Sequence, residues 1–151
     1  MMKNLLTKAE KQSGFTLIEL LVVIGILSVL LAIVLIAINP GKQFGQANDT
    51  KRKSDVGAIL NSIGAYAADH KGALPGGIPT DPTPAVEAGT ICADLVTNYI
   101  SALPTDPSLN TDAITSCAGT PTTGYKVVKD SANRVTVNAP SAEGDPVSAT
   151  R

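Results

Sequence analysis

Residues 13–40 read SGFTLIELLVVIGILSVLLAIVLIAINP, and this stretch decides the fold of the chain. Between Phe15 and Ile38 the side chains that resist burial in hydrocarbon are Thr16, Glu19 and Ser28. A helix rises about 1.5 Å per residue, so the run reaches roughly 36 Å. A bilayer core is about 30 Å thick, and a slightly tilted helix of this length crosses it. The stretch therefore predicts a transmembrane helix at residues 15–39.

Glu19 is the unusual residue of this helix, because a carboxylate in an apolar helix costs on the order of 3 kcal/mol on insertion scales. Directly before the run, a basic leader at residues 1–14 ends at Gly14. A cut between Gly14 and Phe15 would create a positively charged amine close to Glu19. A secretory signal instead has its cleavage site after a short apolar region, which is then discarded. Here the apolar helix would stay in the mature protein.

The segment GFTLIELL at residues 14–21 resembles the processing motif of type IV pilins and type II secretion pseudopilins. The resemblance covers the first third of the chain. It implies that a membrane aspartyl prepilin peptidase cuts after Gly14 and methylates the new amine of Phe15. It also implies that identical or related pilin subunits assemble into a helical filament through these helices, at an inner-membrane assembly platform.

The physics of Glu19 fits filament assembly. In a core with little water, the Glu19 carboxylate of one subunit would meet the Phe15 amine of its neighbour. A broken buried pair costs about 3 to 5 kcal/mol, so the pair would act as a register check. A simpler interpretation places Glu19 near the helix N-terminus, where the macrodipole favours an acid by about 0.3 to 1 kcal/mol. The leader and Gly14 favour the assembly role.

The positive charges of the leader set the expected orientation, because lysines stay on the cytoplasmic side of a membrane helix. The head is then extracytoplasmic, on a bacterial single-pass protein of the inner (cytoplasmic) membrane that later joins an extracellular or periplasmic filament. A second basic cluster lies farther from the apolar run, and we interpret it as a solvated face rather than a lipid or phosphate site: Lys51, Arg52 and Lys53. The formal net charge of −1 does not indicate a nucleic-acid partner.

Pro40 is expected to end or kink the membrane helix, since it lacks an amide donor and disfavours helical geometry at Asn39. A second, amphipathic helix is predicted at residues 40–72, with Gly72 as its stop. Its apolar residues recur at helical spacing on one face: Val56, Ile59, Leu60, Ile63, Tyr66 and Ala67. Residues 42–54 are mostly polar and lack this stripe, so we expect them to be exposed or to face the filament.

Residues 73–144 are predicted to form a small, loop-rich head. It begins with a proline- and glycine-rich connector at residues 73–84, which a short helix follows around residues 85–100. Cys92 and Cys117 are expected to form a disulfide because the head lies outside the cytoplasm. The bridge would stabilise the head by about 3 to 4 kcal/mol in the chain-entropy model. Two cysteines and one distant histidine, in contrast, make no metal constellation.

The clearest strand signal lies near the C-terminus. Apolar and polar residues alternate in residues 125–130 and again in residues 134–138, around a turn at 131–133. Two strands alone are marginally stable, so a third strand is expected around Ile114 or in the tail. Residues 145–151 otherwise indicate a flexible tail. The prediction is an α+β, pilin-like fold, with a long N-terminal helix packed on a small antiparallel sheet, as the resemblance also implies.

The sequence does not indicate an enzyme, since it lacks a phosphate-binding glycine loop after a strand, a nucleophile elbow and carboxylates paired at a recognisable spacing. Three aspartates lie in loops from which oxygen ligands for calcium could converge: Asp81, Asp106 and Asp112. Related major pseudopilins bind calcium in such a loop. Aspartates beside proline also form turns, and we favour that interpretation over a metal site.

The functional hypothesis is therefore a prepilin that becomes the structural subunit of a type IV pilus-like filament, without catalysis of its own. A type II secretion major pseudopilin is the alternative, because the N-terminal motif is shared by both. A third hypothesis is a single-pass membrane-anchored binding module whose helix only tethers the head. That module would not depend on Gly14 or Glu19.

Overall fold

The computed structural model describes residues 14–81 and 83–151. The chain divides into two compact units, residues 1–40 and 41–151. The predicted leader lies outside the described residues except for Gly14, and so does residue 82 of the connector.

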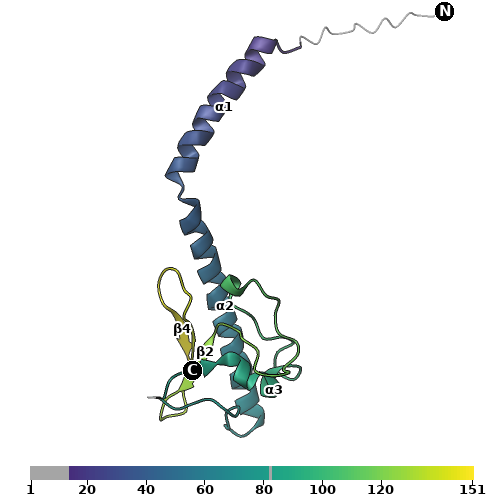
Figure 1. The fold of residues 1–151 in the computed structure, drawn as a ribbon, viewed down its shortest axis with the longest axis vertical. Helices are drawn as coiled ribbons and strands as arrows, with labels where there is room; N and C mark the ends of the chain where they lie inside the picture. Colours follow the sequence, from purple (N-terminus) through teal and green to yellow (C-terminus); the bar gives the residue numbers. More distant parts are fainter. Residues whose placement is uncertain (1–13, 82) are drawn as a thin grey trace, which may run out of the picture. The chain divides into compact units, whose positions relative to one another are not determined.

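Helix α1 spans Leu17–Ala37 and contains the apolar run (Figure 1). Its N-cap is Thr16, and its C-cap, Ile38, has an extended backbone with φ −96° and ψ 103°. The next helix, α2, begins at Pro40. Proline suits a first helical position, because its missing amide would have no partner there and its φ is already helical. The regular helix is therefore interrupted at Ile38 and Asn39, directly before Pro40.

Helix α2 spans Pro40–Asp69 and forms the long element of the head unit. Four residues of the predicted apolar stripe are buried in the core: Val56, Ile59, Leu60 and Ile63. After Asp69, the amide of Gly72 donates to the carbonyl of Ala67 at 2.7 Å, and Gly72 has a φ of +88°. This left-handed closure is the glycine stop that the sequence predicts.

The first half of α2 differs from the prediction. Residues 42–54 were expected to be exposed or to face the filament, yet Gly45, Asp49 and Arg52 are buried. The prediction of a solvated basic triplet is likewise wrong for Arg52, whose exposed fraction is 0%. The reason is that carboxylates from distant loops surround its guanidinium.

An antiparallel sheet of order β1-β2-β3-β4 completes the α+β fold. The strands span Val86–Glu87, Lys126–Lys129, Val135–Ala139 and Val147–Thr150. In the central pair Val127 lies opposite Val137, which confirms the predicted hairpin. The buried valines of the sheet join the residues of α2 in one hydrophobic core.

The expectation of a flexible tail at residues 145–151 is wrong, because this segment contains β4. Arg151 exchanges both backbone hydrogen bonds with Val135, at 2.8 and 2.9 Å, and Val147 is buried. Of the places suggested for a third strand, the tail is therefore correct. Ile114 forms an isolated bridge with Leu103.

The expected helix at residues 85–100 is also mostly wrong. The segment begins with β1, continues in the 3₁₀ turn Ala88–Ile91 and becomes helical in α3, Cys92–Leu95. A side chain on Gly89 would place its Cβ 1.7 Å from the carbonyl oxygen of Pro121, so the loop after the disulfide packs directly on this backbone. That close approach, together with pairing of β1 to β2, competes with a regular helix. A second 3₁₀ turn spans Pro107–Leu109.

The predicted disulfide is confirmed. Cys92 and Cys117 are bonded, with their Cα atoms 5.5 Å apart. Cys92 is buried in the core, so the bridge ties the loop before β2 to α3.

Candidate functional site

Helix α1 is the first candidate region, because no described residue covers its apolar surface. None of its described residues is buried, and its large apolar side chains are exposed by about half or more. Apolar surface contributes roughly 25 cal/mol per Å² when it is removed from water, so a bare helix of this kind requires a bilayer or other chains. Among the described residues, α1 is the one helix long and apolar enough to cross a membrane, with a mean hydropathy of 3.3.

The start of α1 brings the predicted processing and assembly residues together. Gly14 and Phe15 are exposed and precede the helix in backbone without regular structure. A Cβ at Gly14 would meet no atom within 4 Å. The Gly14–Phe15 bond therefore lies in exposed, non-helical backbone, a few residues before Glu19 in the first turn of α1.

Glu19 is held by Thr16 in a reciprocal capping box. The amide and the hydroxyl of Thr16 donate to Oε2 of Glu19 at 2.9 and 2.7 Å. The amide of Glu19 in turn donates to Oγ1 of Thr16 at 3.3 Å. The carboxylate thus satisfies donors at the helix N-terminus, which is where a helix favours negative charge.

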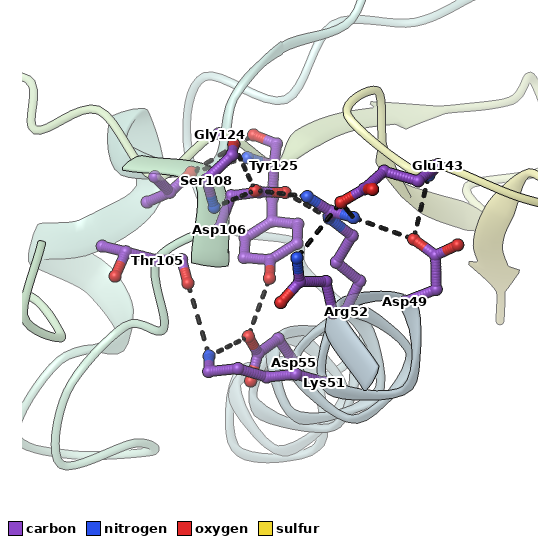
Figure 2. Close-up of polar contacts among 12 residues, drawn as sticks. Asp49, Lys51, Arg52, Asp55, Thr105, Asp106, Ser108, Gly124, Tyr125 and Glu143 are labelled. Carbon is purple, nitrogen blue, oxygen red and sulfur yellow. Dashed lines mark hydrogen bonds and ion pairs between the residues drawn. The ribbon is translucent and has the colours of Figure 1, made fainter. Parts of the chain in front are cut away.

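The second candidate region is an ionic cluster in the head, centred on Arg52 (Figure 2). The guanidinium binds Asp106 through two parallel bonds, Nε to Oδ2 at 2.9 Å and Nη2 to Oδ1 at 3.0 Å. Its Nη1 donates to Oδ1 of Asp49 at 2.8 Å and lies 3.6 Å from Oε1 of Glu143. We call these four residues, Asp49, Arg52, Asp106 and Glu143, the Arg52 clasp. Fork-to-fork geometry of this kind gives strong, directional ion pairs.

The Asp106 end of the clasp fixes the loop before β2. Burial by itself would raise the pKa of Asp106, but hydrogen bonds from Arg52 and Ser108 outweigh it and lower the pKa to about 2. The amide and hydroxyl of Ser108 donate to Oδ1 of Asp106 at 2.9 and 2.6 Å. Gly124 has a φ of +80°, and a Cβ there would lie 2.7 Å from Cβ of Asp106. Glycine is therefore required beside the clasp.

The Asp49 end fixes the loop between β3 and β4. Asp49 accepts the backbone amides of Glu143 at 3.0 Å and Gly144 at 2.8 Å. The bond from Glu143, followed by that from Arg52, lowers the pKa of Asp49. Asn48 adds a bond from Nδ2 to Oε1 of Glu143 at 3.1 Å. One arginine of α2 thereby joins two loops that are far apart in the sequence.

A second set of polar contacts involves Lys51 and Asp55 of α2 and the hydroxyl of Tyr125 (Figure 2). The hydroxyl of Tyr125 donates to Oδ2 of Asp55 at 2.7 Å, and Lys51 pairs with the same carboxylate. Tyr125 is completely buried. Burial and then the nearby Asp55 raise the pKa of its phenol, so it stays protonated and donates. These side chains satisfy one another and hold the loop before β2 against α2.

Two of the three calcium candidates, Asp106 and Asp112, line one pocket together with Asp55. Asp106 is paired with Arg52, and Asp112 is exposed in the loop that follows. The backbone amide of Asp81 donates to the backbone carbonyl of Lys129 in β2 at 2.8 Å. In residues 14–81 and 83–151, no three His, Cys, Asp or Glu side chains converge on a point that would hold a metal ion.

Neither the role of Thr16 nor the Arg52 clasp was predicted from the sequence. The pattern Thr16-x-x-Glu19 is a capping-box signature, so that signal was present in the sequence. The clasp had a partial signal, since Asp49 and Arg52 are spaced for contact on a helix face. Its main acceptor, Asp106, is 54 residues away from Arg52, and no local pattern connects them.

Comparison with known protein families gives one match, over residues 10–35, to the prokaryotic N-terminal methylation motif. That motif is the signature of type IV pilins and pseudopilins, which are structural subunits and not an enzyme family. It covers Gly14, Phe15, Glu19 and most of α1. No curated protein and no solved structure matches the chain.

Proposed function

We propose that this chain is the structural subunit of a type IV pilus-like filament. It would be made as a prepilin, cut between Gly14 and Phe15 by a prepilin peptidase, methylated on the new amine and assembled through α1. The observation that supports this most is the coincidence of the methylation motif with a helix whose apolar surface is left exposed by residues 14–81 and 83–151.

Helix α1 fits two successive environments. Before assembly its apolar surface would lie in the bilayer, which anchors the chain as a single-pass membrane protein. In the filament the same surface would pack against α1 of other copies. Glu19 is the one charged residue of α1, and the amine of Phe15 in a neighbouring copy is the partner that would neutralise it.

The head fits an extracytoplasmic location. Its Cys92–Cys117 disulfide is typical of an oxidising compartment. The basic leader would keep the other end of α1 in the cytoplasm. An assembly platform in the inner membrane would then receive the subunit from the bilayer.

The test is filament assembly in bacteria that contain a prepilin peptidase and the assembly machinery. Glu19→Ala should reduce the yield of sheared filaments at least tenfold, because it leaves the amine of a neighbour unpaired. Ser28→Ala is the matched control. Ser28 is the other polar side chain inside α1, and its hydroxyl already donates to the carbonyl of Ile24 at 2.7 Å.

Normal filament yield from Glu19→Ala would contradict the proposed pairing, and a membrane-tethered chain that forms no filament in any host would contradict the proposed function. A type II secretion pseudopilus is the alternative assembly. Surface filaments made by this chain support the pilus, and rescue of protein secretion by the chain supports the pseudopilus.

A further inference from the structure

One polar row crosses the sheet on the face turned away from the core. Its members lie directly opposite one another in successive strands: Glu87 of β1, Lys126 of β2, Asn138 of β3 and Ser148 of β4. Side chains alternate between the two faces of a strand, and the adjacent Val127 and Val137 are buried in the core. Neighbouring strands are about 4.8 Å apart, so Lys126 has Glu87 on one side and Asn138 on the other at that spacing. The amine of Lys126, on a flexible four-carbon stem, can reach both.

The carboxylate of Glu87 is fixed beside this amine. Its Oε1 lies 2.9 Å from Nζ of Lys126. Its Oε2 accepts the amide of Thr123 at 3.1 Å, the hydroxyl of Thr123 at 3.0 Å and the amide of Gly124 at 3.2 Å. Both side chains of the pair are partly buried. Glu87 is therefore a carboxylate in hydrogen-bonding contact with a lysine amine, which is the position of a group that takes up a proton.

Asn138 lies on the other side of the same amine, and its carbonyl oxygen has an unusual environment. Oδ1 is buried, and no group in residues 14–81 and 83–151 donates a hydrogen bond to it. Buried polar atoms in folded proteins are nearly always bonded, so an exception requires an explanation. Without a hydrogen bond to hold it, the carboxamide can turn its carbon toward Lys126, and burial keeps competing water away.

We propose that Lys126 and Asn138 form an isopeptide bond within the chain, with Glu87 as the proton acceptor. Glu87 takes one proton from the ammonium group of Lys126, and the neutral Nζ attacks Cγ of Asn138. The Nζ–Cγ bond forms and the Cγ–Nδ2 bond breaks. Nδ2 leaves as ammonia with the second proton of Nζ, and the ammonia carries away the proton that Glu87 held. The step is not a redox reaction, and it needs no co-reactant.

The reaction happens once in each chain, so it does not require a fast rate. The ion pair of Glu87 and Lys126 favours the charged form of both groups, and the neutral amine that attacks is a minor state. A slow step that cannot easily be reversed still goes to completion during the life of the protein. The product joins β2 to β3 covalently, in addition to their backbone ladder. The inference concerns the head alone and does not rest on the proposed function.

Tryptic mapping of the full chain tests the bond directly. The purified chain is denatured, its disulfide is reduced and alkylated, and the peptides are weighed after digestion. Trypsin cleaves after lysine and arginine, so an unlinked chain gives residues 72–126 and 135–151 as separate peptides. A linked chain is not cut after Lys126. It gives residues 72–129 joined to residues 135–151, lighter by one ammonia than the sum of the two peptides.

Three variants assign the roles, and one serves as a control. Lys126→Arg keeps a positive charge opposite Glu87 but lacks the attacking amine, and Asn138→Ala lacks the carboxamide, so neither should give the joined peptide. Glu87→Gln keeps the size of the side chain without its base, and the joined peptide should form roughly a hundredfold more slowly or less. Lys129→Arg, on the same strand but opposite Val135, should form the bond like the parent. Formation of the Cys92–Cys117 disulfide in each variant shows that the head has folded.

The expected result is the joined peptide in the parent and in Lys129→Arg. Separate peptides from a parent chain whose disulfide has formed would overturn the proposal, and so would the joined peptide in Lys126→Arg. Loss of ammonia from residues 135–151 without a link to Lys126 would also overturn it, because the lost group would then have been replaced by a different reaction of Asn138. An unchanged rate in Glu87→Gln would contradict the role given to Glu87.

Discussion

The burial of helices α1 and α2 is the reverse of what their hydropathy suggests. Helix α1 is almost entirely apolar and has no buried residue, whereas α2 is largely polar and buries Arg52 completely. The difference shows that hydropathy alone does not decide burial here, because the most apolar helix has no buried residue and a polar helix buries a charged side chain. Burial within the chain depends in part on an ionic clasp.

The largest effect is expected from removing the cation of the clasp. Arg52→Ala leaves the carboxylates of Asp49 and Asp106 without their partner in a buried site, which should lower the free energy of unfolding by about 3 to 5 kcal/mol. Chemical unfolding of the full chain in detergent micelles measures the loss. Lys53→Ala, on the exposed face of the same helix, is the control and should change stability by less than about 0.5 kcal/mol. Equal effects of the two variants would contradict the role of Arg52.

A pair of apolar substitutions tests the comparison directly. Ile59→Ala removes a completely buried side chain of α2 and should lower the free energy of unfolding of the head by about 2 to 5 kcal/mol. Leu27→Ala in α1 removes an exposed side chain and should leave head stability within about 0.5 kcal/mol. The same unfolding experiment measures both. A large effect of Leu27→Ala would mean that α1 supports the head itself.

The disulfide is expected to contribute less than the clasp. Replacing both Cys92 and Cys117 by serine should lower the free energy of unfolding by roughly 3 kcal/mol, since it frees the loop between them in the unfolded chain. Thermal unfolding with and without a reductant measures it. The double variant should be insensitive to the reductant, and a parental chain that is equally insensitive would argue against a stabilising bridge.

Lowering the pH should weaken the clasp and reduce the stability of the fold, because protonation removes the charge of Asp106. The folded pKa of Asp106 is about 2, below its ordinary value of 3.8. The stabilisation is therefore complete above pH 4 and is lost as the pH falls toward 2, a change of about 2 kcal/mol. Unfolding curves across this range test it. Asp106→Asn should be less stable at neutral pH and should show a flatter acid dependence.

Much of the fold could be predicted because its signals are local. The apolar run, the break at Pro40, the stripe from Val56 to Ile63 and the glycine stop each follow from neighbouring residues. The alternating valines similarly predicted the hairpin of β2 and β3. The Cys92–Cys117 pair followed from the expected compartment and from there being no other cysteine.

The remaining features depend on partners that are distant in the sequence. Arg52 has the appearance of a surface charge until Asp106 and the loop of Glu143 are placed beside it. The strand β4 is short and follows a segment rich in turn-forming residues, and it exists because β3 offers a free edge. The expected helix near Gly89 was replaced because another loop packs on that glycine.

The most direct test of the central claim is the intact mass and N-terminal sequence of the chain from membranes of cells with their own prepilin peptidase. The account predicts a mature chain that begins at N-methylated Phe15 and retains α1. Gly14→Val, which adds a branched side chain beside the bond to be cut, should stay at full length. A parental chain that still begins at Met1 or Met2, or that is cut beyond Ile38, would contradict the account.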